Sequence, residues 1–361
     1  MKLEGIGKIL IIRLRNIGDV VSITPCTRAV KETFPDVHLS VLVEKASEGV
    51  LVGNPFVDEI IVLDKKGIGR PRGIRAFWRE LEFLLDLRAR AFDLVINLHG
   101  GPRSAIQTLF TGARHRLGGF PFWHPWNWVY NIRVRPLEEV AGREARHYRI
   151  VQRHLVTLKH AGIETADPSL VMVVTEEARV SLERLLRERG IGEGRPIVTI
   201  HPATSGKLQR WREERFAQLA DRLIETFGVA VILTSGPREK ETPKRVQERM
   251  RREATNLGGL LTIQELAALL EQSVLFIGLD GAPVHIASAL GTPLVAIFGP
   301  TSDTWRPWTK ALHAVVRSDP PCLGCKKVCP DGFPRCMDQI SVGQVFKAVL
   351  AMDHLFRRDQ P

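Results

Sequence analysis

The sequence predicts an α/β fold of two Rossmann-like domains that face one cleft. The chain has 361 residues, and a single hydrophobic core usually stops growing below that length, so we expect two domains. Short apolar segments alternate with amphipathic ones in both halves, as in parallel sheets that helices cover on both faces. The turn-rich segment 190–196 separates the halves and places the domains at residues 1–190 and 191–361.

Four apolar runs in the first half predict buried strands, and the segments between them predict helices. The predicted strands are 8–14, 37–43, 59–63 and 94–98, and the predicted helices are 20–33, 46–52, 74–89, 145–160 and 175–189. The aromatic segment 120–130 contains two prolines and predicts an ordered loop or lid.

The second half shows the same rhythm without repeating the residues of the first. Its predicted strands are 197–201, 229–234, 274–278 and 294–298, and its predicted helices are 213–227, 237–252, 262–271, 283–290 and 342–356. Ligands of doubly wound sheets bind beyond the carboxyl ends of the strands. We therefore expect the functional side chains in the turns that follow these strands.

The net charge of +11, from 51 Lys and Arg against 40 Asp and Glu, favours a polyanionic partner. Nucleic acid, an anionic lipid surface and a phosphorylated substrate all fit the charge alone.

No GxGxxG motif follows a strand, which argues against a dehydrogenase, and no HExxH, GxSxG or zinc-finger spacing occurs. The first apolar run, four residues long, is too short for a signal peptide, so we expect a cytoplasmic protein that can touch the membrane from inside.

The turn after the first strand contains a candidate catalytic carboxylate. Gly18 permits the turn, and Asp19 lies at or just before the start of the next helix. A carboxylate in this position can accept a proton from a hydroxyl nucleophile. Asp is also a preferred N-cap residue, so a purely structural role is the alternative.

The segment 201–211 lies between a strand and a helix and contains the groups of a phosphate site. Thr204 and Ser205 offer hydroxyls, and Lys207 and Arg210 offer positive charge. Its spacing is not that of a P-loop, and a polar surface loop is the alternative.

Two further strand ends in the second half have the features of a ligand site. Asp280, Gly281 and Ala282 open a helix whose N-terminus favours a pyrophosphate, and His285 lies one turn further on. A structural role for His285 is the alternative. The segment 298–302 adds a glycine and two hydroxyls at the end of the next strand.

Taken together and in order, these segments resemble glycosyltransferase family 9, the ADP-heptose:lipopolysaccharide heptosyltransferases. The resemblance covers nearly the whole chain. It rests on residues 17–20, 98–101 with Arg103 and Ser104, 201–211 with 214–216, 280–287, 299–302, and the cysteine cluster 322–336 with Met337.

The resemblance implies a GT-B fold with an N-terminal acceptor domain, a C-terminal nucleotide-sugar domain and a last helix that packs back across both. It implies inverting transfer of heptose from ADP-heptose to the lipid A-linked inner core of lipopolysaccharide, with Asp19 as general base. No metal, other cofactor or nucleic acid is required. The implied donor contacts are Thr204, Ser205, Lys207, Arg210, Asp280, Gly281, Ala282 and His285, and the implied acceptor contacts are Gly18, His99, Arg103 and Ser104.

The sequence departs from the family pattern at two places in the donor half. Gln209 stands before Arg210 where the family often has Lys, so either Lys207 or Arg210 is the expected phosphate contact. Gly281 stands where the family often has a hydroxyl residue, which affects the nucleotide or sugar accepted.

Four of the five cysteines form a cluster with the spacing C-x2-C-x3-C-x6-C, namely Cys322, Cys325, Cys329 and Cys336. This is not a common zinc-ribbon or ferredoxin pattern. A structural metal, disulfide bonds and free thiols are all compatible with it.

The arginine-rich helix 74–90 and the tryptophan segment 123–128 are candidates for contact with phosphorylated lipid A and an anionic membrane surface. A solvated helix face and core packing are the alternatives.

Two other functions fit a two-domain nucleotide-binding chain: a nucleotide-sugar epimerase-like enzyme, and a non-catalytic lipopolysaccharide- or nucleotide-binding protein.

Overall fold

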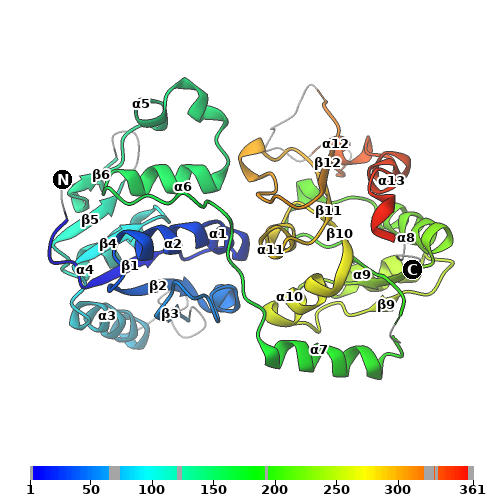
Figure 1. The fold of residues 1–361 in the computed structure, drawn as a ribbon, viewed down its shortest axis with the longest axis horizontal. Coiled ribbons are helices and arrows are strands. Elements are labelled where there is room, and N and C mark those ends of the chain that lie inside the picture. Colours follow the sequence, from blue (N-terminus) through cyan, green and yellow to red (C-terminus); the bar gives the residue numbers. More distant parts are fainter. Residues whose placement is uncertain are drawn as a thin grey trace. The chain divides into compact units, whose positions relative to one another are not determined.

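The computed structural model describes residues 3–64, 74–119, 124–191, 194–320, 329 and 332–356. The chain divides into two compact units, Met1–Val173 and Val174–Pro361 (Figure 1). This division comes earlier than the predicted boundary at 190, because helix α7 (Glu176–Glu188) packs against α10 (Ile263–Gln272) of the second unit. The Ser181 hydroxyl donates to Glu265 over 2.6 Å and Arg179 pairs with Glu271 over 2.8 Å, which ties α7 to that unit.

The first unit is built on a six-stranded sheet of order β3-β2-β1-β4-β5-β6, parallel throughout. Its strands are β1 (Lys8–Ile12), β2 (His38–Glu44), β3 (Glu59–Leu63), β4 (Leu94–Asn97), β5 (His115–Gly118) and β6 (Ile132–Arg133). The four predicted strands are β1 to β4. The sequence analysis missed β5 and β6 because they are short and contain charged residues, so neither reads as an apolar run.

The helices of the first unit differ from the prediction in two ways: residues 102–110 and 137–141 form helices that were not predicted, and predicted helices are broken. They are α1 (Ile17–Ser22), α2 (Thr24–Thr33), α3 (Ile74–Ala89), α4 (Pro102–Phe110), α5 (Leu137–Ala141) and α6 (Ile150–Lys159), with 3-10 turns η1 (Lys45–Val50), η2 (Asn127–Val129) and η3 (Arg143–His147). The predicted helix 20–33 is interrupted at Ile23, since Pro25 has no N–H to donate to the Val21 carbonyl. The Thr24 hydroxyl donates to that carbonyl instead, over 2.9 Å.

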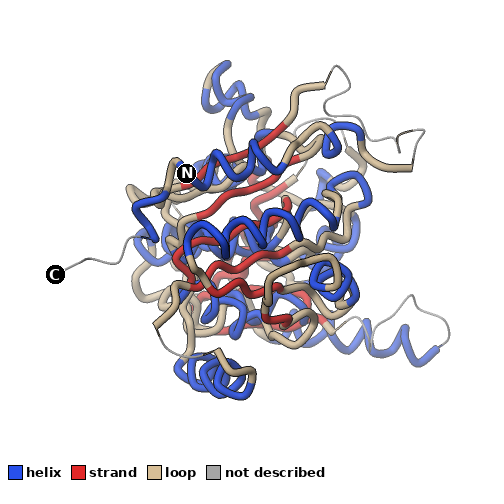
Figure 2. The backbone as a smooth tube through the Cα atoms, turned by 90° about the vertical axis from the view of Figure 1, so that its right-hand side faces the viewer, coloured by secondary structure: helices blue, strands red, loops and turns tan. Residues whose placement is uncertain are grey.

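The second unit has its own parallel sheet, of order β12-β11-β10-β7-β8-β9. Its strands are β7 (Ile197–His201), β8 (Ala230–Leu233), β9 (Thr255–Asn256), β10 (Ser273–Leu279), β11 (Leu294–Phe298) and β12 (His313–Arg317). Its other elements are α8 (Glu213–Phe227), α9 (Glu241–Gln247), α11 (Ala282–Leu290), α12 (Arg335–Asp338), α13 (Val342–Leu350), η4 (Lys207–Gln209), η5 (Asp303–Trp305) and η6 (Asp353–Phe356). Figure 2 shows the strands lying between helices, the layered arrangement that the sequence predicts.

Both sheets reverse their strand order at one point, between β1 and β4 in the first unit and between β7 and β10 in the second. The loops that leave adjacent strands at such a point go to opposite faces of the sheet, and a ligand crevice forms there. The strands on either side are apolar and buried; Ile9 to Ile12 of β1 are fully buried, for example. Each unit therefore has a rigid edge on which polar side chains can be held.

The last helix packs within the second unit. α13 contacts α8, β11 and β12, and the ring of Phe356 in η6 stacks on Phe227 of α8 with centroids 4.2 Å apart. Among the described residues, no helix is both long enough and apolar enough to cross a bilayer.

Candidate active site

Asp19 lies in the first turn of α1, at the carboxyl edge of β1, and 7% of its surface is exposed. It is not the N-cap of this helix: Asn16 occupies that position with φ of 60°, a left-handed conformation that Asn tolerates better than most residues. The Asn16 amide donates to Asp19 Oδ2 over 2.7 Å. The capping interpretation is therefore wrong, and the carboxylate is held by side chains around it.

Arg13 is the main partner of Asp19, and the sequence analysis missed it. Its guanidinium forms an ion pair with Asp19 Oδ1 through Nη2 and donates to the Leu98 carbonyl through Nη1. Leu98 follows β4, so one arginine connects both strand ends at which the order of this sheet reverses. A charged residue directly after an otherwise buried β1 was the signal in the sequence.

The predicted acceptor residues gather at the same edge, where α4 begins after β4. The Ser104 hydroxyl is buried and donates to the Gly100 carbonyl over 2.9 Å. Arg103 forms an ion pair with Glu80 of α3 over 2.7 Å. His99 is half-buried at the end of β4, and its N–H donates to Asn97 Oδ1 over 3.1 Å. Ser104 and Arg103 thus have structural partners, and Gly18 is buried within α1.

In the second unit, Gln209 joins three strand ends. Its Nε2 donates to Asp280 Oδ2 over 2.9 Å and to Thr301 Oγ1 over 3.1 Å, and its Oε1 accepts from Thr204 over 3.4 Å. Thr204 follows β7, Asp280 follows β10 and Thr301 follows β11. The structure therefore brings together three segments that the sequence singled out, and it does so through a residue that the sequence analysis treated only as the absence of a lysine.

The loop around Gln209 depends on two glycines that allow close approach. A Cβ at Gly206 would lie 2.0 Å from Gln209 Oε1. A Cβ at Gly299 would lie 2.8 Å from Met337 Sδ and 3.1 Å from the Leu208 carbonyl oxygen. These contacts explain why the strand-end segments 201–211 and 298–302 both contain glycine.

Two titratable groups at this edge are shifted by burial. Burial raises the pKa of Asp280, and hydrogen bonds from Thr301 and Gln209 partly oppose the rise. Burial lowers the pKa of His201 to about 4, so its ring is neutral at pH 7; its Nδ1 lies 3.0 Å from the Thr234 hydroxyl. The ring of His201 therefore adds no positive charge at this edge of the sheet.

The two predicted phosphate cations, Lys207 and Arg210, line a pocket of about 330 Å³ together with Thr204. Neither has an ion-pair partner within the described part of the chain, whereas Arg212, which also lines the pocket, pairs with Asp338 of α12. Gln209 and Asp280 do not line this pocket, but Leu208 and Arg210, the sequence neighbours of Gln209, do. Lys207 and Arg210 are thus available to an anionic ligand.

Gly281, Ala282 and His285 lie at the start of α11, and Ser205 is exposed in the β7 loop. A Cβ at Gly281 would lie 3.7 Å from the Leu279 carbonyl oxygen and 3.8 Å from Pro283 Cδ, which are ordinary van der Waals distances. His285 is buried, and its ring lies edge-on to Trp305 with centroids 6.1 Å apart. His285 is thus packed against an aromatic ring, whereas the contacts at Gly281 would tolerate a Cβ.

Two cysteines of the predicted cluster, Cys322 and Cys325, lie outside the described residues. Cys329 is half-buried, and Cys336 is buried in α12. Among the residues that the structure describes, no three His, Cys, Asp or Glu side chains are grouped so as to hold a metal ion. A metal at the complete cluster stays a prediction.

Comparison with known proteins identifies the family. The model of glycosyltransferase family 9 (heptosyltransferase) matches residues 81–331. Lipopolysaccharide heptosyltransferase 3 of Escherichia coli (strain K12) is 30% identical over 304 residues, which are 83% of this chain and 85% of that protein. The chain belongs to glycosyltransferase family 9.

Solved structures agree with this assignment at the level of the fold. A family 9 glycosyl transferase from Veillonella parvula has a TM-score of 0.81 and 24% identity, covering 99% of this chain and 98% of that one. E. coli heptosyltransferase WaaC, solved with ADP, has a TM-score of 0.71 and 18% identity, covering 95% and 99%. The predicted GT-B class, with two Rossmann-like α/β units, is confirmed.

Gln209 has a different role from the two predicted phosphate cations beside it in the sequence. The sequence resemblance left the phosphate contact open between Lys207 and Arg210, and the structure places both at one pocket while Gln209 points to Asp280. A neutral amide therefore stands directly beside the buried carboxyl group of Asp280.

Proposed function

We propose that this chain transfers heptose from ADP-heptose to the inner core of lipopolysaccharide, with inversion at the anomeric carbon. Membership of glycosyltransferase family 9 and the relative described as lipopolysaccharide heptosyltransferase 3 support this reaction class. The ADP in the WaaC structure supports the nucleotide. The observation that carries the proposal most directly is the convergence of Thr204, Gln209, Asp280 and Thr301 at the edge where the second sheet reverses its order.

The second unit binds the donor in this proposal. The open N-terminus of α11 faces the diphosphate, because free N–H groups and the helix dipole favour negative charge. Lys207 and Arg210 bind phosphate oxygens from the pocket that they share. Asp280 meets a hydroxyl group of the sugar or ribose, since a buried carboxyl group would repel the diphosphate itself.

The first unit binds the acceptor and supplies the base. Asp19 takes the proton from the acceptor hydroxyl while that oxygen attacks the anomeric carbon of the donor. The bond between that carbon and the phosphate oxygen breaks on the opposite face, and ADP leaves with both electrons. General-base assistance of this kind contributes about 10²–10⁴-fold to a rate, and cations with a helix N-terminus can meet the charge on ADP without a metal ion.

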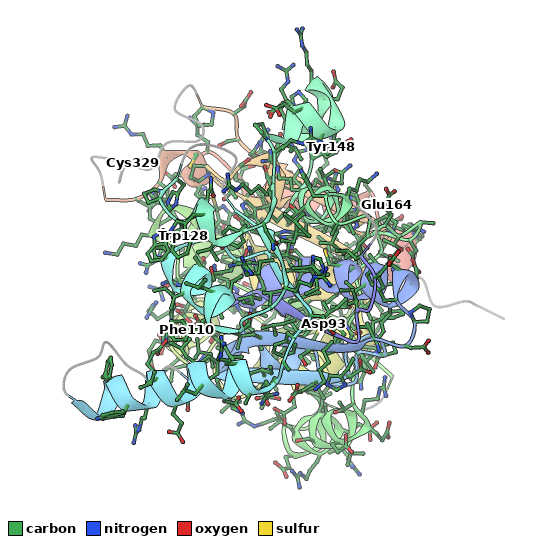
Figure 3. The ribbon with its side chains drawn as sticks, turned by 90° about the vertical axis from the view of Figure 1, so that its left-hand side faces the viewer. Asp93, Phe110, Trp128, Tyr148, Glu164 and Cys329 are labelled. Atoms are coloured by element: carbon green, nitrogen blue, oxygen red, sulfur yellow. The ribbon has the colours of Figure 1, made fainter. Side chains whose placement is uncertain are left out.

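The acceptor is an anionic lipid, so we place the protein at the cytoplasmic face of the membrane, attached peripherally through α3. Phe77 and Trp78 on this helix are each 59% exposed, and Leu85 is 53% exposed. Figure 3 shows α3 as the long helix at the lower edge of the first unit, and it labels Trp128, another 59% exposed ring. Aromatic side chains of this kind suit the interface between lipid and water, and the net charge of +11 suits anionic head groups.

A thermal-shift screen of ADP, UDP and GDP, followed by an ADP-release assay, tests the proposal. We expect ADP to raise the melting temperature selectively, and ADP release from ADP-heptose to require heptose-deficient lipopolysaccharide. A free nucleotide sugar as product would indicate an epimerase-like enzyme instead. Binding of ADP without release, with any core acceptor, would indicate a non-catalytic protein.

A further inference from the structure

Arg13 lies at the carboxyl edge of the first sheet and is buried, with 9% of its surface exposed. One end of its guanidinium pairs with Asp19 on α1, and the other donates to the Leu98 carbonyl after β4. A planar guanidinium can make both contacts at once with little freedom to rotate, which a lysine ammonium cannot do. Arg13 therefore holds the Asp19 carboxylate in a fixed position relative to the end of β4.

The Asp19 carboxylate is restrained on both oxygens. Oδ1 accepts from Arg13, and Oδ2 accepts from the Asn16 amide over 2.7 Å. Its own backbone is held as well, since the Ser22 hydroxyl donates to the Asp19 carbonyl over 2.7 Å. Each carboxylate oxygen has two acceptor sites, so a substrate hydroxyl can still bind to it.

Asp19 forms the ion pair with Arg13, whereas two other titratable side chains near Arg13 are uncharged. Burial, reinforced by the Arg13 charge, holds the pKa of His154 on α6 well below its usual range, so this histidine is neutral. Burial raises the pKa of the Cys26 thiol on α2, and Arg13 opposes that rise only in part. Glu44 ends β2 at the same edge of the sheet, and its N–H donates to the Leu14 carbonyl over 3.1 Å.

Arg13 and its neighbour His154 each have a buried nitrogen atom, and the one on Arg13 makes the Asp19 ion pair important. Arg13 Nε and His154 Nε2 are both buried, and neither has a hydrogen-bond partner within the described part of the chain. A buried cation with an unused donor is costly unless another contact compensates for it. The ion pair with Asp19 is that contact, so removing either partner leaves the other charge uncompensated.

We propose that Arg13 is the positioning residue for Asp19: it fixes the carboxylate against β4 so that the base faces the acceptor hydroxyl. This role rests on the proposed function, because it gives Asp19 its catalytic orientation. Arg13 does not contact the reacting atoms and acts only through Asp19. Loss of such orientation costs about 10²-fold in rate when the reacting geometry is displaced by about 1 Å.

Arg13→Ala and Arg13→Lys test the role, with Arg28→Ala as the matched control. Arg28 is also a largely buried arginine of the first unit, but it pairs with Asp167 over 2.8 Å, away from Asp19. We expect Arg13→Ala to lower kcat for ADP release by about 10²-fold with the KM for ADP-heptose unchanged. Methylguanidinium should restore part of the rate, and Arg13→Lys should retain more activity than Arg13→Ala. Equal losses in Arg28→Ala and Arg13→Ala, with no rescue, would overturn the proposal.

The double variant Arg13→Ala with Asp19→Asn separates positioning from an independent effect. If Arg13 acts through Asp19, the double variant is no slower than Asp19→Asn alone. Losses that multiply would overturn the positioning role while leaving Asp19 as base. A full rate in Asp19→Asn would overturn the base and the positioning role together.

A substrate-free measurement keeps the proposal testable if no core acceptor supports turnover. The melting temperatures of wild type, both single variants and the double variant report the coupling between the two side chains. We expect the double variant to lose less than the sum of the single losses. A strictly additive loss would contradict the pairing on which the proposal depends, whatever the reaction.

Discussion

The side-chain amide of Gln209 donates to Asp280 Oδ2 over 2.9 Å, so that a neutral group holds this buried carboxyl group. A lysine at this position would neutralise that carboxyl group and add a positive charge for the diphosphate. With Gln209, the positive charge at the neighbouring pocket comes from other residues, among them Lys207 and Arg210. In our proposal, holding Asp280 and binding phosphate are therefore tasks of different residues.

Replacing Gln209 should weaken the second unit and its binding of ADP. Gln209→Ala leaves the buried Asp280 oxygen without its amide donor, which costs about 1–3 kcal/mol of unfolding free energy. Thermal unfolding and calorimetric titration with ADP measure the two effects. Gln247→Ala is the control, because Gln247 donates to the Ala254 carbonyl on the exposed surface of α9. Equal behaviour of the two variants would contradict the role of Gln209.

Gln209→Lys should have the opposite effect on the donor site. An ammonium group beside Asp280 lowers the pKa of that carboxyl group and attracts the diphosphate. We expect tighter ADP binding than in wild type, with a weaker dependence on Lys207 and Arg210. A calorimetric titration of Gln209→Lys that shows weaker binding would mean that the amide geometry, and not charge, sets the affinity.

Asp19→Ala and Asp19→Asn should keep donor binding and lose turnover. Because Asp19 belongs to the first unit and takes the acceptor proton in our proposal, we expect ADP affinity to persist and ADP release to fall by at least about 10²-fold. Asp93→Asn is the control: its carboxylate accepts from the Gly7 and Lys8 N–H groups over 2.8 Å at the amino edge of the same sheet. Near-normal turnover in the Asp19 variants would remove Asp19 from this role.

The stability of the second unit should fall as the pH drops below the ordinary range of histidine. Burial lowers the pKa of His201 to about 4, so the unfolded chain takes up a proton near pH 6.5 that the folded unit excludes. Between these values the unfolded state binds more protons, and acidification reduces the unfolding free energy by up to about 3 kcal/mol. Chemical denaturation of wild type and His201→Asn from pH 7 to pH 4 checks this. The profile of the variant should be flatter, and parallel profiles would contradict the burial of a neutral ring.

The exposed rings of α3 should anchor the protein to anionic lipid. Phe77→Ser with Trp78→Ser removes two rings that are each 59% exposed, and we expect less protein to sediment with anionic liposomes. Leu260→Ser is the control, since Leu260 is 51% exposed on the second unit. Unchanged sedimentation in the α3 variant would remove this helix from the membrane contact.

Much of this fold follows from local sequence pattern, and several residues of the candidate site lie in turns that the sequence predicts. The apolar runs of β1 and β7 and the turns after them predict where Asp19 and Thr204 lie, because a parallel sheet aligns its strand ends. Strands such as β6 and β9 are two residues long and could not be predicted from periodicity. They form because neighbouring strands offer backbone partners.

Arg13 and Gln209 show what sequence patterns cannot supply. The significance of each depends on a partner far along the chain: Leu98 for Arg13, and Asp280 with Thr301 for Gln209. Such partners are set by the register of adjacent strands, which no local window contains. The same reason explains why α7 joins the second unit, since its contacts are to α10.

In our proposal, this member of glycosyltransferase family 9 attaches a heptose to a lipopolysaccharide core. Mass spectrometry of heptose-deficient lipopolysaccharide, incubated with ADP-heptose and the wild-type protein, detects that transfer. We predict that the acceptor gains the mass of one heptose while ADP accumulates in equal amount, and that Asp19→Asn slows both. An acceptor of unchanged mass, in a sample where the protein binds ADP, would contradict the claim.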